Sequence, residues 1–126
     1  MDLGISGRTA LLCASNAGLG LACAKALVAE GVNVVINGRN SKKTESALAE
    51  LEAIATGSVS SVLADVTTEA GRAALLETCP APDILLNNNA GPSAMQFLDT
   101  KPEDWLETIA GNYLAPIQLI QAVLPN

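Results

Sequence analysis

The segment Cys13-Ala14-Ser15-Asn16-Ala17-Gly18-Leu19-Gly20 decides the fold. It follows an apolar run at residues 9–13 and opens a stretch, residues 18–30, whose apolar side chains recur at helical spacing. Glycines at such a turn let a helix start close against the preceding strand. The unpaired N–H groups of the first helical turn and the positive end of the helix dipole then favour a bound phosphate. Because G-x-G alone is a weak signal, the alternative is an ordinary strand–helix loop with glycines for packing.

Short apolar runs alternate with helical stretches along the rest of the chain. Strands are predicted at residues 9–13, 32–36, 58–63 and 83–86, and helices at residues 18–30, 41–55, 68–79 and 102–124, with Ser41 and Thr67 or Thr68 as caps. This alternation is typical of a parallel sheet covered on both faces. Right-handed crossovers give the strand order 3-2-1-4, so we expect an incomplete Rossmann-like, doubly wound parallel sheet. No repeat or linker interrupts residues 1–126, which predicts a single α/β domain.

The composition excludes several classes of protein. Hydrophobic residues make up 49% of the 126 residues, which is too much for a long disordered chain. A net charge of −6 argues against a nucleic-acid partner, because the phosphate backbone attracts basic surfaces. With 3 widely spaced cysteines and no histidine, we expect neither a disulfide scaffold, nor a metal site, nor a Ser-His-Asp mechanism. Without a basic leader or an apolar run of roughly 18 residues, we expect a cytoplasmic protein with no membrane partner.

The second predicted strand is followed by residues that bear on the choice of dinucleotide. A carboxylate at the end of this strand would bind the ribose hydroxyls of NAD, but Gly38 occupies that place. The guanidinium of Arg39, the next residue, can pair with a 2′-phosphate through its planar fork. In a dinucleotide-binding fold the sequence therefore favours NADP(H) over NAD(H). The alternative is a solvated surface arginine.

The glycine turn resembles that of the short-chain dehydrogenase/reductase family. Gly18 and Gly20 match the last two glycines of the family motif T-G-x-x-x-G-x-G. Cys13 and Ala14 depart from its threonine and its first glycine. The methyl group of alanine leaves the turn possible but makes the approach of a pyrophosphate less close. The resemblance covers essentially the whole chain, but only the first half of the family's domain.

The run Asn87-Asn88-Asn89-Ala90-Gly91 resembles the N-N-A-G motif of the same family, and residues 83–86 resemble the strand before it. The run has one asparagine too many, so two registers stay open, and Asn88 is a motif residue in both. Asparagines in an apolar setting need hydrogen-bond partners, because an unpaired buried amide costs roughly 1–3 kcal/mol. The alternative is an asparagine-rich surface loop.

The resemblance implies a set of cofactor-binding residues and one catalytic residue. The implied cofactor-binding residues are Ser15, Asn16, Gly18, Leu19, Gly20, Arg39, Asp65, Val66, Asn88, Ala90 and Gly91. In the family the pair matched by Asp65-Val66 recognises adenine; the alternative is a turn or cap aspartate. Asn112 matches the asparagine of the family's Asn-Ser-Tyr-Lys set, whose backbone carbonyl holds a water. Pro116 has no N–H to donate to the Asn112 carbonyl, which leaves that carbonyl free; the alternative is a simple kink.

The tyrosine and lysine of the family's Tyr-x-x-x-Lys motif are missing. The only tyrosine is Tyr113, and the residue four positions later is Ile117. The resemblance therefore implies the truncated cofactor-binding half of an NADP(H)-dependent oxidoreductase for a small carbonyl or alcohol substrate, inactive by itself. The alternative is a non-catalytic dinucleotide-binding or sensor module. The open edge of the fourth strand and the partly uncovered last helix predict a homo-oligomer.

Overall fold

Four parallel strands form one sheet in the computed structural model of the protein, which describes residues 2–125. The strands are β1 (Thr9–Leu12), β2 (Asn33–Gly38), β3 (Val59–Leu63) and β4 (Ile84–Leu86), in the order β3-β2-β1-β4. Leu12 of β1 lies opposite Ile36 of β2 and Leu86 of β4, so these strands end at the same edge of the sheet. The predicted α/β class and the strand order 3-2-1-4 are confirmed.

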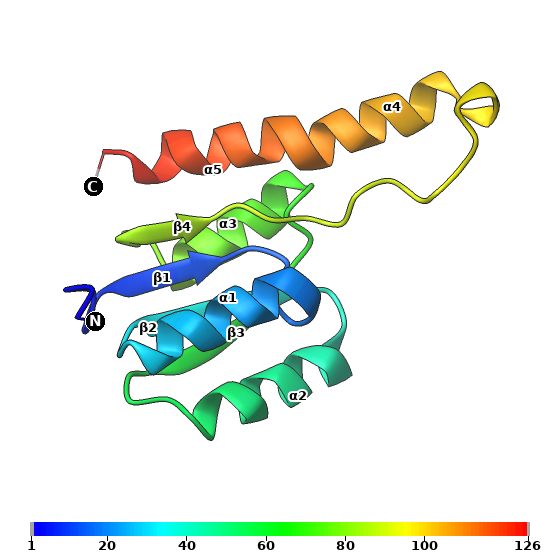
Figure 1. Ribbon diagram of the computed structural model, residues 1–126. Coiled ribbons are helices and arrows are strands. Elements are labelled where there is room, and N and C mark those ends of the chain that lie inside the picture. The colour runs from blue at the N-terminus through cyan, green and yellow to red at the C-terminus, as the bar shows by residue number, and fades with distance from the viewer. Residues whose placement is uncertain (1, 126) are drawn as a thin grey trace.

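Helices cover both faces of this sheet (Figure 1). One face packs against α1 (Gly18–Ala29) and α2 (Ser41–Glu52), and the other against α3 (Glu69–Thr78) and α5 (Ala115–Val123). A 3-10 turn, η1 (Phe97–Asp99), and the helix α4 (Pro102–Ile109) precede a π-helical segment, η2 (Ala110–Leu114), which leads into α5. Within residues 2–125, none of the helices has the length and apolar character needed to cross a bilayer.

The side chains of β1 and the residue after it alternate between two cores. Ala10 and Leu12 pack with α1 and α2, whereas Leu11 and Cys13 pack with α3 and α5. All four side chains are at most 1% exposed. Because both faces of the strand are buried, it reads in the sequence as a continuous apolar run.

Several predicted element boundaries are wrong, and the largest difference is that α2 ends at Glu52 rather than at residue 55. The cap of α2 is Asn40 rather than Ser41, since Oδ1 of Asn40 accepts a hydrogen bond of 2.9 Å from the backbone N–H of Lys43. The second strand continues two residues beyond its predicted end, to Gly38. Of the two predicted caps for α3, Thr68 is the one that accepts the capping hydrogen bond.

The predicted long helix at residues 102–124 changes its hydrogen-bond pattern near the middle. In η2 the N–H of Ala115 donates to the carbonyl of Ala110, five residues back. Pro116 follows directly and has no N–H to donate. The helix therefore widens by one residue at this place and runs on without a sharp kink (Figure 1).

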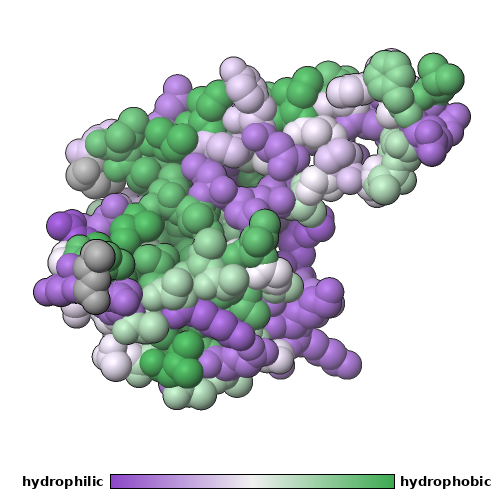
Figure 2. All heavy atoms as spheres, in the orientation of Figure 1, coloured by the Kyte–Doolittle hydropathy of each residue, from purple (hydrophilic) through white to green (hydrophobic). Residues whose placement is uncertain are grey.

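Apolar side chains are exposed along the C-terminal helices (Figure 2). Leu106 on α4 is 66% exposed, and Ile117 and Ile120 on α5 are also exposed.

Candidate cofactor site

An open pocket of about 660 Å³ lies at the carboxyl ends of the strands. Doubly wound sheets bind their ligands at this edge, where the strand order reverses. The turn after each strand contributes to the wall. The lining residues are Ala14, Asn16, Ala17 and Leu19 after β1; Asn37, Gly38, Arg39, Asn40 and Lys43 at the end of β2 and the start of α2; Ala64, Asp65 and Val66 after β3; and Asn88, Asn89 and Ala90 after β4.

The pocket brings together most of the predicted cofactor-binding residues. Those in its wall are Asn16, Leu19, Arg39, Asp65, Val66, Asn88 and Ala90. Gly91 lies in the wall of an adjoining pocket of about 350 Å³, together with Asn112. Gly18 and Gly20 belong to the first turn of α1 and shape the site without lining it.

The glycine turn has a backbone conformation that few residues adopt. Ala14 has a φ of 43°, the only positive φ of a residue other than glycine within residues 2–125. This left-handed conformation costs an L-residue about 1–2 kcal/mol. Gly20 lies against the turn, since a Cβ on it would be 2.5 Å from the Ala14 carbonyl oxygen and 2.7 Å from Cα of Ser15. A glycine is needed here for α1 to begin so close to β1.

A buried amide that sequence analysis missed ties this turn to the sheet. Asn37 is 1% exposed, and its Oδ1 accepts a hydrogen bond of 3.1 Å from the N–H of Ala14. Its Nδ2 donates to the carbonyls of Val62 and Ala64, at 3.1 Å and 3.0 Å. The side chain therefore joins the turn after β1 to the end of β3. An asparagine directly after an apolar strand run is the sequence signal that could have found it.

Ser15 lies beneath the turn and is fully buried. Its hydroxyl donates to the carbonyl of Leu12 at 2.7 Å and accepts from the N–H of Asn37 at 2.9 Å. Its own N–H donates to the carbonyl of Asn37 at 2.7 Å. Because its donors are used inside the fold, Ser15 supports the turn from below in this structure.

The asparagine run connects the end of β4 to two other parts of the site. Nδ2 of Asn88, the residue common to both predicted registers, donates to the carbonyl of Ala14 at 3.0 Å. Asn89 lies against the last helix, where a Cβ on Gly111 would be 2.6 Å from its Nδ2. The run therefore holds the glycine turn on one side and contacts η2 on the other.

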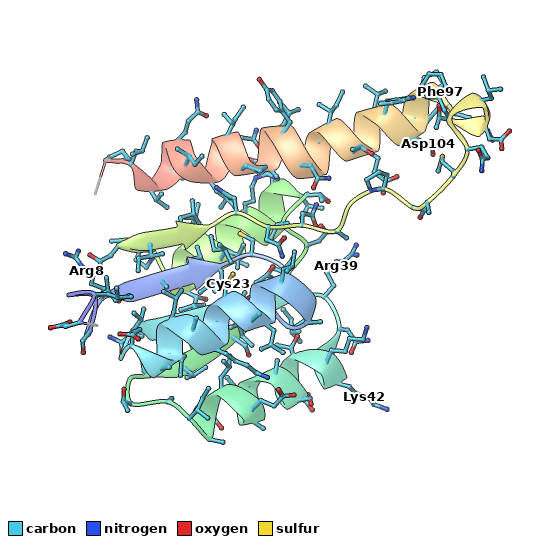
Figure 3. The ribbon with its side chains drawn as sticks, in the orientation of Figure 1. Arg8, Cys23, Arg39, Lys42, Phe97 and Asp104 are labelled. Carbon is cyan, nitrogen blue, oxygen red and sulfur yellow. The ribbon has the colours of Figure 1, made fainter. Side chains whose placement is uncertain are left out.

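A cation and an anion form an ion pair at the pocket. Nη1 of Arg39 lies 3.6 Å from Oδ2 of Asp65, and the Arg39 side chain, labelled in Figure 3, is 69% exposed. Oδ1 of Asp65 accepts from the hydroxyl and the N–H of Thr67, at 2.7 Å and 2.9 Å. The Thr67 hydrogen bonds first, and Arg39 to a lesser extent, lower the pKa of Asp65. Asp65 is thus held in place, while an exposed pair this long leaves Arg39 able to exchange its partner for another anion.

Replacing Thr67 with valine is expected to raise the pKa of Asp65 toward its ordinary value of about 3.9, because the hydroxyl donor is lost. A group whose pKa is lowered in the folded state contributes to the stability of the fold at pH values above its unfolded-state pKa. This contribution is lost as the pH falls through the folded-state pKa. Urea unfolding of both proteins should show a difference of less than about 1 kcal/mol near neutral pH that shrinks below about pH 4. A difference that does not vary with pH would mean that Thr67 acts through packing alone.

Asn112 links the last helix to the loop after β4. Its Nδ2 lies 3.4 Å from the carbonyl oxygen of Ala90 and 3.3 Å from that of Thr108. The π-helical segment that carries it is a distortion frequently found at functional sites. The neighbouring Tyr113 is 64% exposed and lines neither pocket, so it brings no acid to this site.

Comparison with known proteins gives consistent matches. The profile of a family described as short chain dehydrogenase matches residues 8–126. The chain is 32% identical to the uncharacterized oxidoreductase YvaG of Bacillus subtilis (strain 168), over 100% of this chain and 48% of that protein. The chain spans about half the length of the curated relatives it matches.

The fold of the chain also matches solved structures of other proteins. An L-sorbose reductase from Gluconobacter frateurii, complexed with NADPH and L-sorbose, has a TM-score of 0.92 and 29% identity, over 99% of this chain and 49% of that one. A metagenomic short-chain oxidoreductase in complex with NADP has a TM-score of 0.83 and 29% identity, over 96% of this chain and 57% of that one. The predicted Rossmann-like architecture agrees with both.

Proposed function

The chain belongs to the short-chain dehydrogenase family of oxidoreductases, and we propose that it forms the NADP(H)-binding part of an enzyme for a small carbonyl or alcohol substrate. One observation carries the choice of cofactor. Arg39 lines the pocket directly after Gly38, which stands where a carboxylate would bind the ribose of NAD. The NADPH and NADP bound to the two structural relatives support the same choice.

The donor groups of the pocket suit a dinucleotide phosphate. We assign the 2′-phosphate to Arg39, whose planar guanidinium matches phosphate geometry. The adenine falls to Asp65 and Val66, and the pyrophosphate to the start of α1 around Leu19, where unpaired N–H groups are available. We propose that Asn88, Ala90 and Gly91 contact the remaining part of the dinucleotide, its nicotinamide half. Bound NADP(H) would supply or accept the hydride of the reaction.

Asn112 is our proposed catalytic residue. Pro116 cannot send the usual helical hydrogen bond to its backbone carbonyl, and this supports a carbonyl that is available to a water beside the substrate. The contact of its side chain with the Ala90 carbonyl would keep the residue next to the cofactor-binding loop.

Calorimetry on the purified chain tests the choice of cofactor. Arg39→Ala is expected to weaken NADPH binding about 10–100-fold, because a hydrogen bond to a charged group contributes about 1.5–3 kcal/mol, and to leave NADH binding unchanged. Lys42→Ala is the matched control, since it removes one positive charge nearby from a side chain that points outward from α2 (Figure 3). NADH binding by the wild-type chain that equals or exceeds NADPH binding would overturn the proposed preference.

A non-catalytic dinucleotide-binding or sensor module is the second candidate, supported by the position of Tyr113, which lines neither pocket of the site. For either candidate we expect the 126-residue chain to show no turnover above background with NADPH and a panel of carbonyl compounds, because it lacks the family's proton donor. Micromolar NADPH binding without turnover would agree with both candidates and would exclude an inert remnant. Robust turnover would exclude the non-catalytic module and contradict the expected inactivity of these 126 residues. The apolar surface of α4 and α5 also supports a homo-oligomer, which a strictly monomeric result in light scattering would exclude.

A further inference from the structure

At the end of β2, the side chain of Asn16 lies over Gly38. A Cβ on Gly38 would overlap Nδ2 of Asn16 and would lie 2.8 Å from Oγ1 of Thr44. Asn16 can occupy this space only because residue 38 is glycine. The place, directly before Arg39, is also the one at which an NAD-binding sheet carries a carboxylate.

Thr44 fixes the orientation of Asn16. Thr44 is 2% exposed, and its hydroxyl donates to the carbonyl of Asn40 at 2.8 Å. With its proton used in this way, the hydroxyl oxygen accepts from Nδ2 of Asn16, at 3.0 Å. One N–H of Nδ2 and the oxygen Oδ1 then remain for the pocket, whose wall Asn16 helps to form.

We propose that Asn16 is a specificity-determining residue for the choice between NADP(H) and NAD(H), an inference that rests on the proposed cofactor. Its neutral amide fills the space in which a carboxylate would bind a ribose hydroxyl and repel a 2′-phosphate. Arg39 and Lys43, which line the same wall, supply the positive charge. Asn16 adds a hydrogen-bond donor and keeps a negative charge away from this position.

The test is the ratio of the NADH and NADPH dissociation constants, measured by calorimetry on the whole chain. Asn16→Ala is expected to lower this ratio about tenfold, because one hydrogen bond to a charged group is lost. Asn16→Asp is expected to lower it further, since a carboxylate repels the 2′-phosphate. Thr44→Val should reproduce part of the loss, and Thr44→Ser, which keeps the hydroxyl, should retain the wild-type ratio.

Gly38→Ala tests the packing, because its methyl group must displace Asn16 from Thr44. It should lower the ratio about as much as Asn16→Ala, and the double variant should lower it no further. Urea unfolding without cofactor shows whether each variant is folded. If Gly38→Ala does not fold, the Asn16→Ala variant alone provides the test.

The outcomes separate the two proposals. An unchanged ratio in Asn16→Ala, or additive effects of Gly38→Ala and Asn16→Ala, would overturn the role of Asn16 while leaving NADP(H) binding intact. A wild-type chain that binds neither cofactor, or prefers NADH, would overturn the proposed function and this inference with it.

Discussion

Gly20→Ala is expected to lower the free energy of unfolding by about 2 kcal/mol and to reduce NADPH affinity by at least about 100-fold. The added Cβ would lie 2.5 Å from the carbonyl oxygen of Ala14 and 2.7 Å from Cα of Ser15. Both are backbone atoms, so α1 as a whole must move away from the turn. That movement displaces the N–H groups proposed to hold the pyrophosphate. The estimate includes an opposing gain of about 0.5–1 kcal/mol, because alanine is the better helix former.

Urea unfolding and NADPH calorimetry measure the two effects separately. Gly91→Ala is the control for stability, because a Cβ there meets nothing within 4 Å. Its free energy of unfolding should change by less than about 0.5 kcal/mol. A Gly20→Ala protein with wild-type stability would show that the turn can yield at no cost, contrary to the packing of α1 against Ala14.

The backbone of Ala14 explains why this turn should be sensitive. It already holds an L-residue at a φ of 43°, in a region where glycine is preferred. Two hydrogen bonds compensate for this conformation. The side chain of Asn88 donates to the carbonyl of Ala14, and the N–H of Ala14 donates to the side chain of Asn37. A further displacement by a methyl group at Gly20 would strain all of these contacts together.

The alternation of strands and helices and the order of the strands could be predicted from the sequence because they follow from local patterns. Apolar runs buried on both faces and helical spacing are visible within one segment. The end of β2 could not be predicted in the same way. The apolar signal stops at Ile36, but the strand continues because the backbone of Asn37 pairs with Val62 of β3. Periodicity does not report such partners.

The candidate site shows the same division. Arg39, Asp65 and Asn88 lie within two residues of the ends of their strands, and parallel strands bring such positions to one edge of the sheet. The role of Thr44 could not be predicted from the sequence, because its contact with Asn16 joins positions 28 residues apart. Similarly, Pro116 predicts a missing helical hydrogen bond but not the π-helical segment that replaces it.

Asn37→Leu is expected to lower the free energy of unfolding by about 3–4 kcal/mol, because it removes three hydrogen bonds between a buried side chain and part-buried backbone groups. These are the N–H of Ala14 and the carbonyls of Val62 and Ala64. Leucine has a similar volume, so a loss of packing contributes little. Urea unfolding near neutral pH gives the size of the effect. A loss below about 1 kcal/mol would mean that water replaces the amide.

Asn37→Asp distinguishes the role of the side-chain oxygen, which accepts one hydrogen bond, from that of Nδ2, which donates two. The introduced carboxylate can still accept from the N–H of Ala14, but it faces the carbonyl oxygens of Val62 and Ala64. Burial and these oxygens should raise its folded-state pKa above the unfolded value of about 3.9. A group whose pKa is raised in the folded state contributes to the stability of the fold at pH values below its unfolded-state pKa. This contribution is lost as the pH rises through the folded-state pKa. The deficit relative to wild type should therefore grow between about pH 4 and pH 7.

Asn33→Asp is the matched control at the other end of β2. Its side-chain oxygen accepts from the N–H and the hydroxyl of Ser58, at 2.9 Å and 3.0 Å, in an exposed setting. A carboxylate at this position keeps both donors and loses one exposed hydrogen bond of 3.2 Å, from Nδ2 to the carbonyl of Gly7. Because water reaches this end of the strand, the deficit should stay below about 1 kcal/mol and should grow less with pH than that of Asn37→Asp. If Asn37→Asp showed the same pH profile, the amide of Asn37 could not be the buried junction between the glycine turn and β3.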